Sequence, residues 1–344
     1  MSDSSQILQD LSTVADTILR YKEAIIISHM NPDADAFGSS CGLASGLRNL
    51  GVLCTVYNES GSIARYSVIP GVAAVNKTLP ASVAEGTVVI VCDCGAAERV
   101  GDSYLPFVKG APFVINIDHH NKNSLFGTLN LVVESASSTS EIVYDLLSAM
   151  QLRIQQEGAI SKDVAVALMA GIIGDTGSFR YPSTSPKTFL VAHDLYVRGA
   201  KPSEIVQELF GSVTLPALRL QSEALSRIQL YSDGRFAEVL VTAEMISRVG
   251  AELLDADSLA ERGRDVQGVC VSALFKQDGD IWRVSLRSRS PQWDVSVVAR
   301  HFGGGGHKAA AAFRWRSDLE SLQSELRVKI QEVLDSPSEE SSSG

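Results

Sequence analysis

The sequence predicts an α/β fold: an N-terminal doubly wound parallel-sheet domain, joined by a helical connector to a smaller α/β domain. Continuous apolar runs recur in the first part of the chain and alternate with helical stretches, which is typical of parallel strands buried on both faces. Beyond residue 230, short alternating strands return and indicate a second sheet. The chain has 344 residues, enough for two domains with separate cores.

The elements of the first domain follow in order. Residues 7–22 have the periodicity of an amphipathic helix, and a strand is predicted at 24–28. The segment 36–50 carries small and apolar residues at helical spacing and ends before Gly51, a typical helix-ending residue. The remaining elements of this domain are strands at 52–57, 88–92 and 113–117 and helices at 140–150 and 162–173.

The character of the chain changes after Pro182. Residues 186–230 are predicted to form successive helices, and alternating strands follow at 237–241, 269–275 and 281–288, the last two joined by a tight turn at 277–280. The resulting division is a first domain at 1–185, a helical connector at 186–230, a second domain at 231–335 and a disordered serine-rich tail at 336–344.

Composition and charge narrow the function. A net charge of −10 argues against an extended basic surface for long nucleic acid. Between residues 281 and 316, however, seven basic residues accompany one acid, which favours a small phosphorylated ligand. The five cysteines indicate a reducing cytoplasm, and Cys92 and Cys94 are expected to be ordinary buried residues. No signal peptide or membrane span is predicted, and the three tryptophans are assigned to core packing.

Acids and histidines follow the apolar runs at several separate places. Ligands of α/β sheets gather beyond the carboxyl ends of the strands, so these side chains are expected to converge. Carboxylates and imidazoles without thiolates suit two divalent ions such as Mn²⁺, which can activate water against a phosphate ester. A lone aspartate at a strand end is usually a helix cap. Several acids and histidines at the ends of different strands and helices indicate one shared site. The residues are His29, Asp33, Asp35, Asp93, Asp118, His119, His120 and Asp175.

The order of these motifs resembles the DHH phosphoesterase superfamily. The matching motifs are His-x-x-x-Asp-x-Asp at 29–35, Asp93, Asp-His-His at 118–120 and Gly-Asp-Thr-Gly at 174–177. Arg287-Ser288 and the Gly-Gly-Gly-His at 304–307 resemble its DHHA1 substrate domain. The resemblance covers about residues 10–330. The string at 174–181 is most similar to the bacterial group of nano-RNases and phosphatases of 3′-phosphoadenosine 5′-phosphate (pAp).

The resemblance implies a role for each matching residue. One Mn²⁺ would be held by His29, Asp33 and Asp93. A second would be held by Asp35, Asp93, His119 and Asp175, so that Asp93 is the bridge. Asp118 would orient an imidazole, and His120 would face the scissile phosphate as electrophile or general acid. Ala34 and Ala312 stand where glycine is common, and neither change removes a ligand.

The second domain supplies candidates for phosphate recognition. Glycines allow a backbone to approach an anion closely, and the run at 303–306 before His307 has this composition. Arg287 can bind a phosphate through its fork of donors. The expected substrate-binding residues are Arg287, Ser288, Gly304, Gly305, Gly306, His307 and, in the first domain, Arg180.

The predicted function is that of a cytoplasmic two-metal phosphoesterase. It would hydrolyse short oligoribonucleotides, including dinucleotides such as pGpG and pApA, to mononucleotides, and pAp to AMP. The runner-up is a cyclic di-AMP phosphodiesterase. A RecJ-like exonuclease is disfavoured because a long polymer would need a broad basic surface, and an inorganic pyrophosphatase because its substrate domain carries different motifs. The alternative from another class is a nucleotide-sensing module without activity. Intact ligand positions disfavour the last. No long duplex or membrane is expected as partner, and a homodimer is left open.

Overall fold

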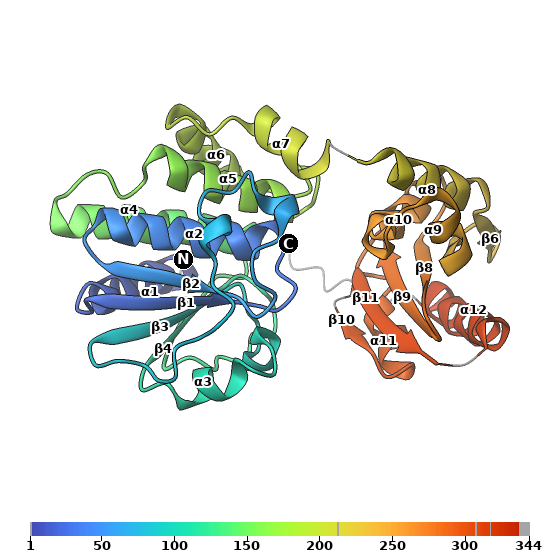
Figure 1. Cartoon of the computed structure of the whole chain (residues 1–344), viewed down its shortest axis with the longest axis horizontal. Helices are drawn as coiled ribbons and strands as arrows, with labels where there is room; N and C mark the ends of the chain where they lie inside the picture. The colour runs from blue at the N-terminus through green and yellow to red at the C-terminus, as the bar shows by residue number, and fades with distance from the viewer. Residues whose placement is uncertain (1, 212, 307, 317, 337–344) are drawn as a thin grey trace. The chain divides into compact units, whose positions relative to one another are not determined.

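The chain folds into two units, each built around its own sheet (Figure 1). The structure is a computed structural model that describes residues 2–211, 213–306, 308–316 and 318–336. The first unit extends to residue 212, and the second begins at residue 213. The predicted α/β architecture with a second, C-terminal sheet is confirmed.

The first sheet is parallel throughout, as predicted. Its order is β2-β1-β3-β4-β5, and each neighbouring pair runs in the same direction. The edge strand β5 was not predicted, because its short sequence alternates leucine with a polar asparagine and has no apolar run. The strands are β1 (Glu23–Ser28), β2 (Leu53–Tyr57), β3 (Thr87–Cys92), β4 (Val114–Asp118) and β5 (Leu129–Val132).

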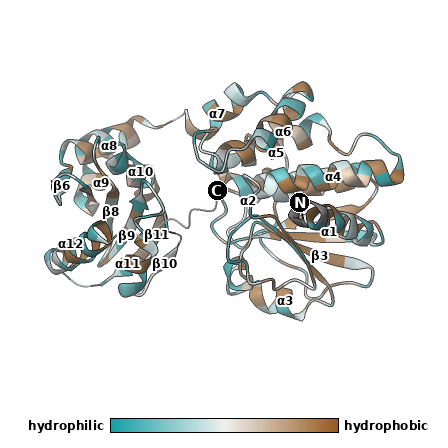
Figure 2. Ribbon diagram, turned by 180° about the vertical axis from the view of Figure 1, so that it is seen from behind, coloured by the Kyte–Doolittle hydropathy of each residue, from teal (hydrophilic) through white to brown (hydrophobic). Residues whose placement is uncertain are grey.

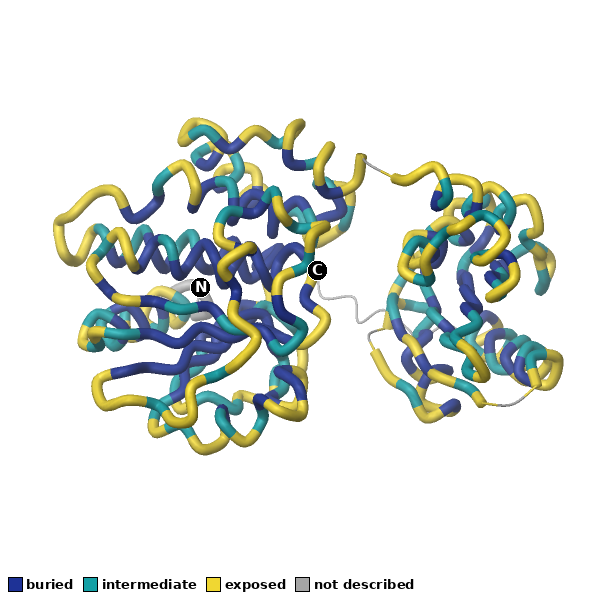
Figure 3. The backbone as a smooth tube through the Cα atoms, in the orientation of Figure 1, coloured by how far each residue is buried: buried dark blue, intermediate teal, exposed yellow. Residues whose placement is uncertain are grey.

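Helices cover both faces of this sheet. Ile26 and Ile90 pack on one face against four helices, while Ile25 and Val89 pack on the other against η3 and α3. The central strands are therefore apolar on both faces and almost wholly buried (Figures 2 and 3). The four helices are α1 (Ser2–Ile18), α2 (Ala34–Asn49), α4 (Thr139–Ile154) and α5 (Lys162–Asp175), and the opposite face carries η3 (Ala97–Val100) and α3 (Leu105–Gly110).

The helices α2 and α5 pack unusually closely because glycines line their contact. A Cβ added at Gly38 would lie 2.6 Å from the carbonyl oxygen of Ala167, and one at Gly174 would lie 2.7 Å from the Cβ of Ala34. At Gly171 an added Cβ would lie 2.7 Å from the Asp35 carboxylate. No larger residue fits these positions, so the glycines set the distance between the two helices.

The segment predicted at 186–230 is helical up to Ser226, after which the strand β6 begins at Gln229, and its helices divide between the two units. The helices α6 (Pro186–Val197) and α7 (Pro202–Phe210) belong to the first unit, and α8 (Leu215–Ser226) belongs to the second. Thr188 in α6 donates a hydrogen bond to Glu141 in α4, which fixes the start of α6 on the first unit. Short 3₁₀ turns η1 (Ala64–Tyr66) and η2 (Val72–Ala74) complete this unit.

The second unit contains a mixed sheet of order β10-β11-β9-β8-β7-β6. Its neighbours run antiparallel except β7 and β8, and the predicted hairpin between β8 and β9 turns at Gly279, whose φ is 62°. The alanine-rich β11 was not predicted, because alanine does not favour strands by itself. The strands are β6 (Gln229–Tyr231), β7 (Phe236–Val241), β8 (Val271–Asp278), β9 (Ile281–Ser288), β10 (Gly305–Gly306) and β11 (Ala310–Trp315).

Helices cover both faces of the second sheet as well. Leu322 and Val295 pack on the face that carries Phe275, whereas Leu220 and Leu259 pack on the face of Leu274. The first group comes from α11 (Val295–His301) and α12 (Leu319–Asp335), and the second from α8, α9 (Ala243–Val249), η4 (Leu253–Ala256) and α10 (Leu259–Asp265).

Three further predictions about side chains can be compared with the structure. Trp282, Trp293 and Trp315 pack against the core of the second unit, as predicted. All five cysteines are free thiols, and Cys92 and Cys94 are buried ones. Within the described ranges, no helix has the length and apolarity needed to cross a membrane. The predicted disordered tail lies outside the described residues from 337 onward.

The glycine contact between α2 and α5 leads to a stability prediction. Replacing Gly38 by alanine forces the new Cβ against the Ala167 carbonyl. The resulting overpacking should lower the free energy of unfolding by about 1–3 kcal/mol, although alanine favours a helix more than glycine does by about 1 kcal/mol. Urea denaturation followed by circular dichroism measures this. The control is Gly110→Ala, whose Cβ meets nothing within 4 Å. Equal stability of Gly38→Ala and wild type would contradict the packing argument.

Candidate metal centre

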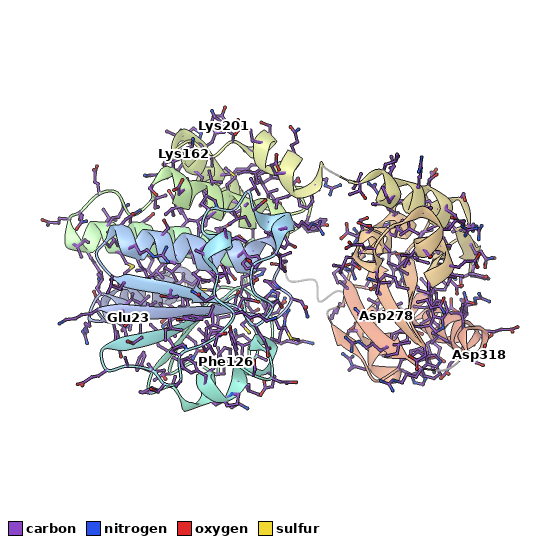
Figure 4. The ribbon with its side chains drawn as sticks, in the orientation of Figure 1. Glu23, Phe126, Lys162, Lys201, Asp278 and Asp318 are labelled. Atoms are coloured by element: carbon purple, nitrogen blue, oxygen red, sulfur yellow. The ribbon has the colours of Figure 1, made fainter. Side chains whose placement is uncertain are left out.

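Acidic and imidazole side chains gather where the strands of the first sheet end. His29 follows β1, and Asp93 follows β3. Asp118 is the last residue of β4, and His119 and His120 come directly after it. Because the strands are parallel, their carboxyl ends lie at one edge of the sheet. Glu23 begins β1 and marks the opposite edge (Figure 4).

The remaining acids come from the two closely packed helices. Asp33 is the N-cap of α2, and its Oδ1 accepts hydrogen bonds from the backbone N–H groups of Asp35 and Ala36, both at 3.0 Å. Asp35 is in the first turn of α2 and is buried. Asp175 is the last residue of α5, at the helix end where the sequence placed it. The glycines between the helices therefore allow acids from both to approach the strand ends.

The structure brings every predicted metal ligand into one cluster. Within each of three groups, the ligand atoms lie within 4.8 Å of one another. His119 belongs to two of the groups, and so does Asp93. The groups are His29 with Asp33 and Asp93, Asp35 with His119 and Asp175, and Asp93 with His119 and His120.

Asp93 occupies the centre of the cluster. Its Oδ2 lies 3.5 Å from His29 Nε2, and its Oδ1 lies 3.7 Å from His119 Nε2. Its backbone is left-handed, with φ of 57°, a conformation that aspartate tolerates better than most residues. Such backbone geometry is concentrated at functional sites. The two oxygens of Asp93 thus face different histidines, as a carboxylate shared by two ions would.

Hydrogen bonds orient two of the imidazoles. His29 Nδ1 lies 3.0 Å from the carbonyl oxygen of Met30, to which it can donate a hydrogen bond. The other ring nitrogen, Nε2, then faces Asp33 and Asp93. His120 Nδ1 lies 2.7 Å from Oδ1 of the fully buried Asp118. The amide of Asn123 donates to the other oxygen of Asp118 at 2.6 Å. Asp118 therefore orients His120 rather than His119.

The first turn of α4 is a functional element that the sequence reasoning missed. The backbone N–H of Thr139 donates to Asp35 Oδ2 at 2.7 Å, and that of Ser140 donates to Asp35 Oδ1 at 3.0 Å. The Thr139 hydroxyl donates to Asp93 Oδ1 at 3.1 Å. The run Ser-Ser-Thr-Ser before Glu141 is a recognisable N-cap signature, but nothing in it indicates a metal site.

The carboxylates of the cluster repel one another. Burial raises the pKa of Asp175 to about 9, and the charges of Asp35 and Asp93 add to the shift. Burial and the adjacent Asp93 raise the pKa of Asp35 to about 7. Burial lowers the pKa of His29, but contact with Asp93 outweighs it and brings the pKa to about 8. Burial by itself raises the pKa of Asp93, but the contact with His29 outweighs burial and holds the pKa well below its usual range.

These shifts and the donor set together fit divalent cations. Protons on Asp35 and Asp175 relieve the repulsion in the metal-free protein, and a divalent ion relieves it more fully. The three ligand groups contain only carboxylates and imidazoles, which suit ions such as Mn²⁺ and Mg²⁺. The geometry therefore supports a site for divalent metal at this edge of the sheet.

The predicted phosphate-binding residues lie in the second unit. Arg287 is on β9, between Ser272 on β8 and Ala310 on β11, and its Nη1 donates to the Leu286 carbonyl. Ser288 is buried, and its hydroxyl donates to the Ser290 carbonyl at 2.6 Å.

The glycine run ends in the short strand β10. A Cβ added at Gly304 would lie 2.2 Å from the Ala312 carbonyl, and Gly306 has φ of 141°, so both positions require glycine. Gly305 pairs with Ala312 on β11, where the sequence departs from the family pattern. His307 lies outside the described residues.

Arg180 lies in the loop that follows Asp175. Its Nε donates to the Gly177 carbonyl at 2.6 Å, and the residue is exposed. The loop passes through three consecutive left-handed residues, Gly177, Ser178 and Phe179. Arg180 therefore belongs to the first unit, five residues after Asp175, whereas the other substrate-binding candidates belong to the second unit in sequence.

The raised pKa values predict how stability depends on pH and metal. The pKa values of Asp35 and Asp175 are about 7 and 9, above their usual 3.8. As pH rises, these carboxyl groups therefore lose their protons at a lower pH in the unfolded chain than in the folded protein. The free energy of unfolding falls over that range of pH. His29, with its pKa of about 8, acts in the same direction above pH 6.5. The Tm of EDTA-treated protein should therefore fall from pH 6.5 to 8.5. The rise in Tm on adding Mg²⁺ should be larger at the higher pH.

Differential scanning fluorimetry measures both effects. The Asp175→Asn variant is the matched control, because it removes the carboxylate with the largest upward shift and should flatten the dependence on pH. A Mg²⁺-induced rise in Tm that is the same at both pH values would contradict a cluster in which cations displace protons.

Comparisons with known proteins agree with this geometry. Residues 23–172 match the DHH family, N-terminal domain, and residues 239–334 match the DHHA1 domain. A bifunctional oligoribonuclease and PAP phosphatase, NrnA of Bacillus subtilis, is 31% identical over 89% of this chain and 96% of its own length. A cyclic-di-AMP phosphodiesterase, PdeA of Listeria monocytogenes, is 27% identical over 90% of this chain but only 46% of its own length.

Solved structures share the fold. An exopolyphosphatase-related protein from Bacteroides fragilis has a TM-score of 0.85 at 24% identity, covering 95% of this chain and 96% of its own. RecJ from Thermus thermophilus, solved in complex with Mn²⁺, has a TM-score of 0.52 at 15% identity, covering 95% of this chain and 55% of its own. The family matches span most of the sequence, and every residue of the carboxylate–imidazole cluster except Asp175 lies inside the first of them. The chain belongs to the DHH family, with a DHHA1 domain after the DHH domain, and is a metal-binding hydrolase of phosphoester bonds.

Proposed function

We propose that the protein hydrolyses short oligoribonucleotides, including dinucleotides such as pGpG and pApA, to mononucleotides, and pAp to AMP. The observation that carries the proposal is the position of Asp93 between His29 on one side and His119 on the other. A central carboxylate of this kind can join two cations that act on one phosphate. Near-complete coverage of a relative named for both activities supports the choice of substrate.

The proposed ligands form two sets. His29, Asp33 and Asp93 would hold one Mn²⁺. Asp35, Asp93, His119 and Asp175 would hold the second, with Asp93 shared. When bound, such ions lower the pKa of a water molecule and offset the negative charge of a phosphate ester.

The proposed acid is His120. Burial lowers the pKa of its imidazole, but the hydrogen bond to Asp118 and the charge of Asp93 outweigh burial, and the net pKa lies above the ordinary value. The protonated form therefore persists to a higher pH than in an ordinary imidazole. An imidazolium in this position can stabilise the negative charge of the phosphate and donate a proton to the leaving oxygen. Asp118, fixed by Asn123, would keep the ring in place throughout.

The second unit is proposed to hold a terminal phosphate of the substrate. Arg287 lies on β9 and the glycine run ends in β10, and both strands pair with β11 in a basic region of the sequence. His307 follows the glycines in sequence. Arg180 would assist from the first unit. Recognition of one phosphate by these residues and cleavage at another ester suit a short substrate rather than a long polymer. The free thiols are consistent with action in a reducing cytoplasm.

A cyclic di-AMP phosphodiesterase is the second candidate. The supporting observation is the match to a phosphodiesterase of that name along 90% of this chain. The chain spans about half the length of that relative, so the likeness concerns the shared DHH and DHHA1 region. Both candidates use the same cluster and differ in whether the substrate presents a free terminal phosphate.

A substrate panel tests the proposal. Purified protein with Mn²⁺ should hydrolyse pApA, pGpG and pAp faster than cyclic di-AMP, as measured by chromatography of the nucleotide products. EDTA should abolish all four reactions. Faster turnover of cyclic di-AMP than of the linear dinucleotides would favour the second candidate, and no turnover of any of them would contradict both.

The role proposed for Arg287 gives a sharper prediction. Replacing it by alanine should slow hydrolysis of 5′-phosphorylated dinucleotides by about 10- to 1000-fold, the range for losing a charge-assisted contact with a phosphate. Hydrolysis of bis-p-nitrophenyl phosphate should change little, because this ester has no second phosphate to hold. The matched control is Arg283→Ala on the same strand, where Arg283 forms an ion pair with Asp278. Equal loss on both substrates would assign Arg287 to folding instead.

A further inference from the structure

One turn of α4 contacts carboxylates that belong to different ligand groups. Thr139 is the first residue of the helix, and both its backbone N–H and its hydroxyl donate to metal-site acids. The N–H binds Asp35, and the hydroxyl binds Asp93. Thr139 is fully buried, so bulk water does not compete for either hydrogen bond. A single residue thus binds both Asp35 and Asp93, which belong to different ligand groups that share His119.

The hydroxyl bond selects one oxygen of Asp93. Thr139 Oγ1 lies 3.1 Å from Oδ1, the oxygen that also faces His119 Nε2 at 3.7 Å. The other oxygen, Oδ2, faces His29 Nε2 at 3.5 Å. A carboxylate can rotate about its Cβ–Cγ bond, and a donor fixed beside one oxygen opposes that rotation. The hydroxyl therefore determines which oxygen faces which histidine.

The turn that carries Thr139 is itself rigid. The side chain of Ser138 caps the helix by accepting from the backbone N–H of Glu141 at 3.2 Å. The buried Glu141 in turn accepts from Ser137 at 2.7 Å and from Thr188 at 2.8 Å through the same Oε2. These hydrogen bonds restrict the motion of the turn, so the N–H and hydroxyl groups that bind Asp35 and Asp93 are held in place.

We propose that Thr139 is a positioning residue for the metal centre. Its hydroxyl holds Asp93 in the orientation that lets the carboxylate be shared, and its backbone N–H holds Asp35 beside His119. Thr139 is not a ligand and does not contact substrate. The inference rests on the two-ion form of the proposed function, but not on the identity of the nucleotide substrate.

The proposal predicts a selective loss of metal affinity. In Thr139→Val the shape is kept and the hydroxyl is lost, so Oδ1 loses its donor and Asp93 can rotate. Loss of a group that orients a metal ligand typically weakens metal binding about 10- to 100-fold. One of the two Mn²⁺ binding steps should weaken by this factor, and the other should remain close to that of the wild type.

Titration calorimetry of EDTA-treated protein with MnCl₂ measures both steps without any substrate. Electron paramagnetic resonance of the loaded protein gives a second readout, because a shared carboxylate couples the two ions magnetically. The coupled signal of the wild type should be weaker in Thr139→Val. Thr139→Ser keeps the hydroxyl and should restore both affinity and coupling, whereas Thr139→Ala should behave like the valine variant.

The control is Thr87→Val. Thr87 is the first residue of β3, and Asp93 follows the last residue of the same strand. The Thr87 hydroxyl donates to the Glu23 carboxylate at 3.2 Å. Glu23 lies at the opposite edge of the sheet from the metal cluster (Figure 4). This variant loses a similar bond and should bind both ions normally. The proposal is overturned if Thr139→Val binds both ions like the wild type, or if Thr139→Ser loses as much affinity as Thr139→Ala. The serine–alanine pair differs only in the hydroxyl, so the comparison stands even if the valine variant does not fold.

Discussion

Repulsion among buried carboxylates is the constraint on which the first unit depends. Asp35 and Asp93 are almost wholly buried, and Asp175 is close enough to have its pKa raised by both. Contacts with histidines and hydrogen bonds from the first turn of α4 offset part of this charge, and a divalent cation can offset the rest. A fold that holds such groups together must immobilise each of them, because any freedom would let the acids separate and the site would lose its affinity for metal.

The fold supplies that rigidity from three directions. Parallel strands bring Asp93 and Asp118 to one edge of the sheet. The glycine contact between α2 and α5 brings Asp35 and Asp175 to the same place from two helices. The first turn of α4 then fixes Asp35 with two backbone N–H groups. Positive helix-end dipoles and hydrogen bonds thus replace the water that these acids lose on burial.

In the proposed function, the second unit would recognise the substrate while the first unit carries out the chemistry. Its mixed sheet carries a basic segment and a glycine run, whereas the acids and imidazoles of the metal centre are confined to the first unit. An acidic protein can then bind an anionic substrate without placing arginines among the metal ligands, where they would compete with the cations.

The sequence by itself determined the parallel sheet and the order of the two domains, and it predicted which acids and histidines would gather at one site, because apolar runs and the acids after them are local signals. The choice of six of them as metal ligands comes from the family resemblance and stays a prediction. The strands β5 and β11 depend on pairing with neighbours, since Leu129–Val132 and the alanines of Ala310–Trp315 have weak local preference for a strand. Only the tertiary structure decided that Asp118 orients His120 and that Thr139 contacts both Asp35 and Asp93. The two Thr139 contacts join residues 104 and 46 positions apart, and hydrogen bonds over such separations leave no periodic trace in a sequence.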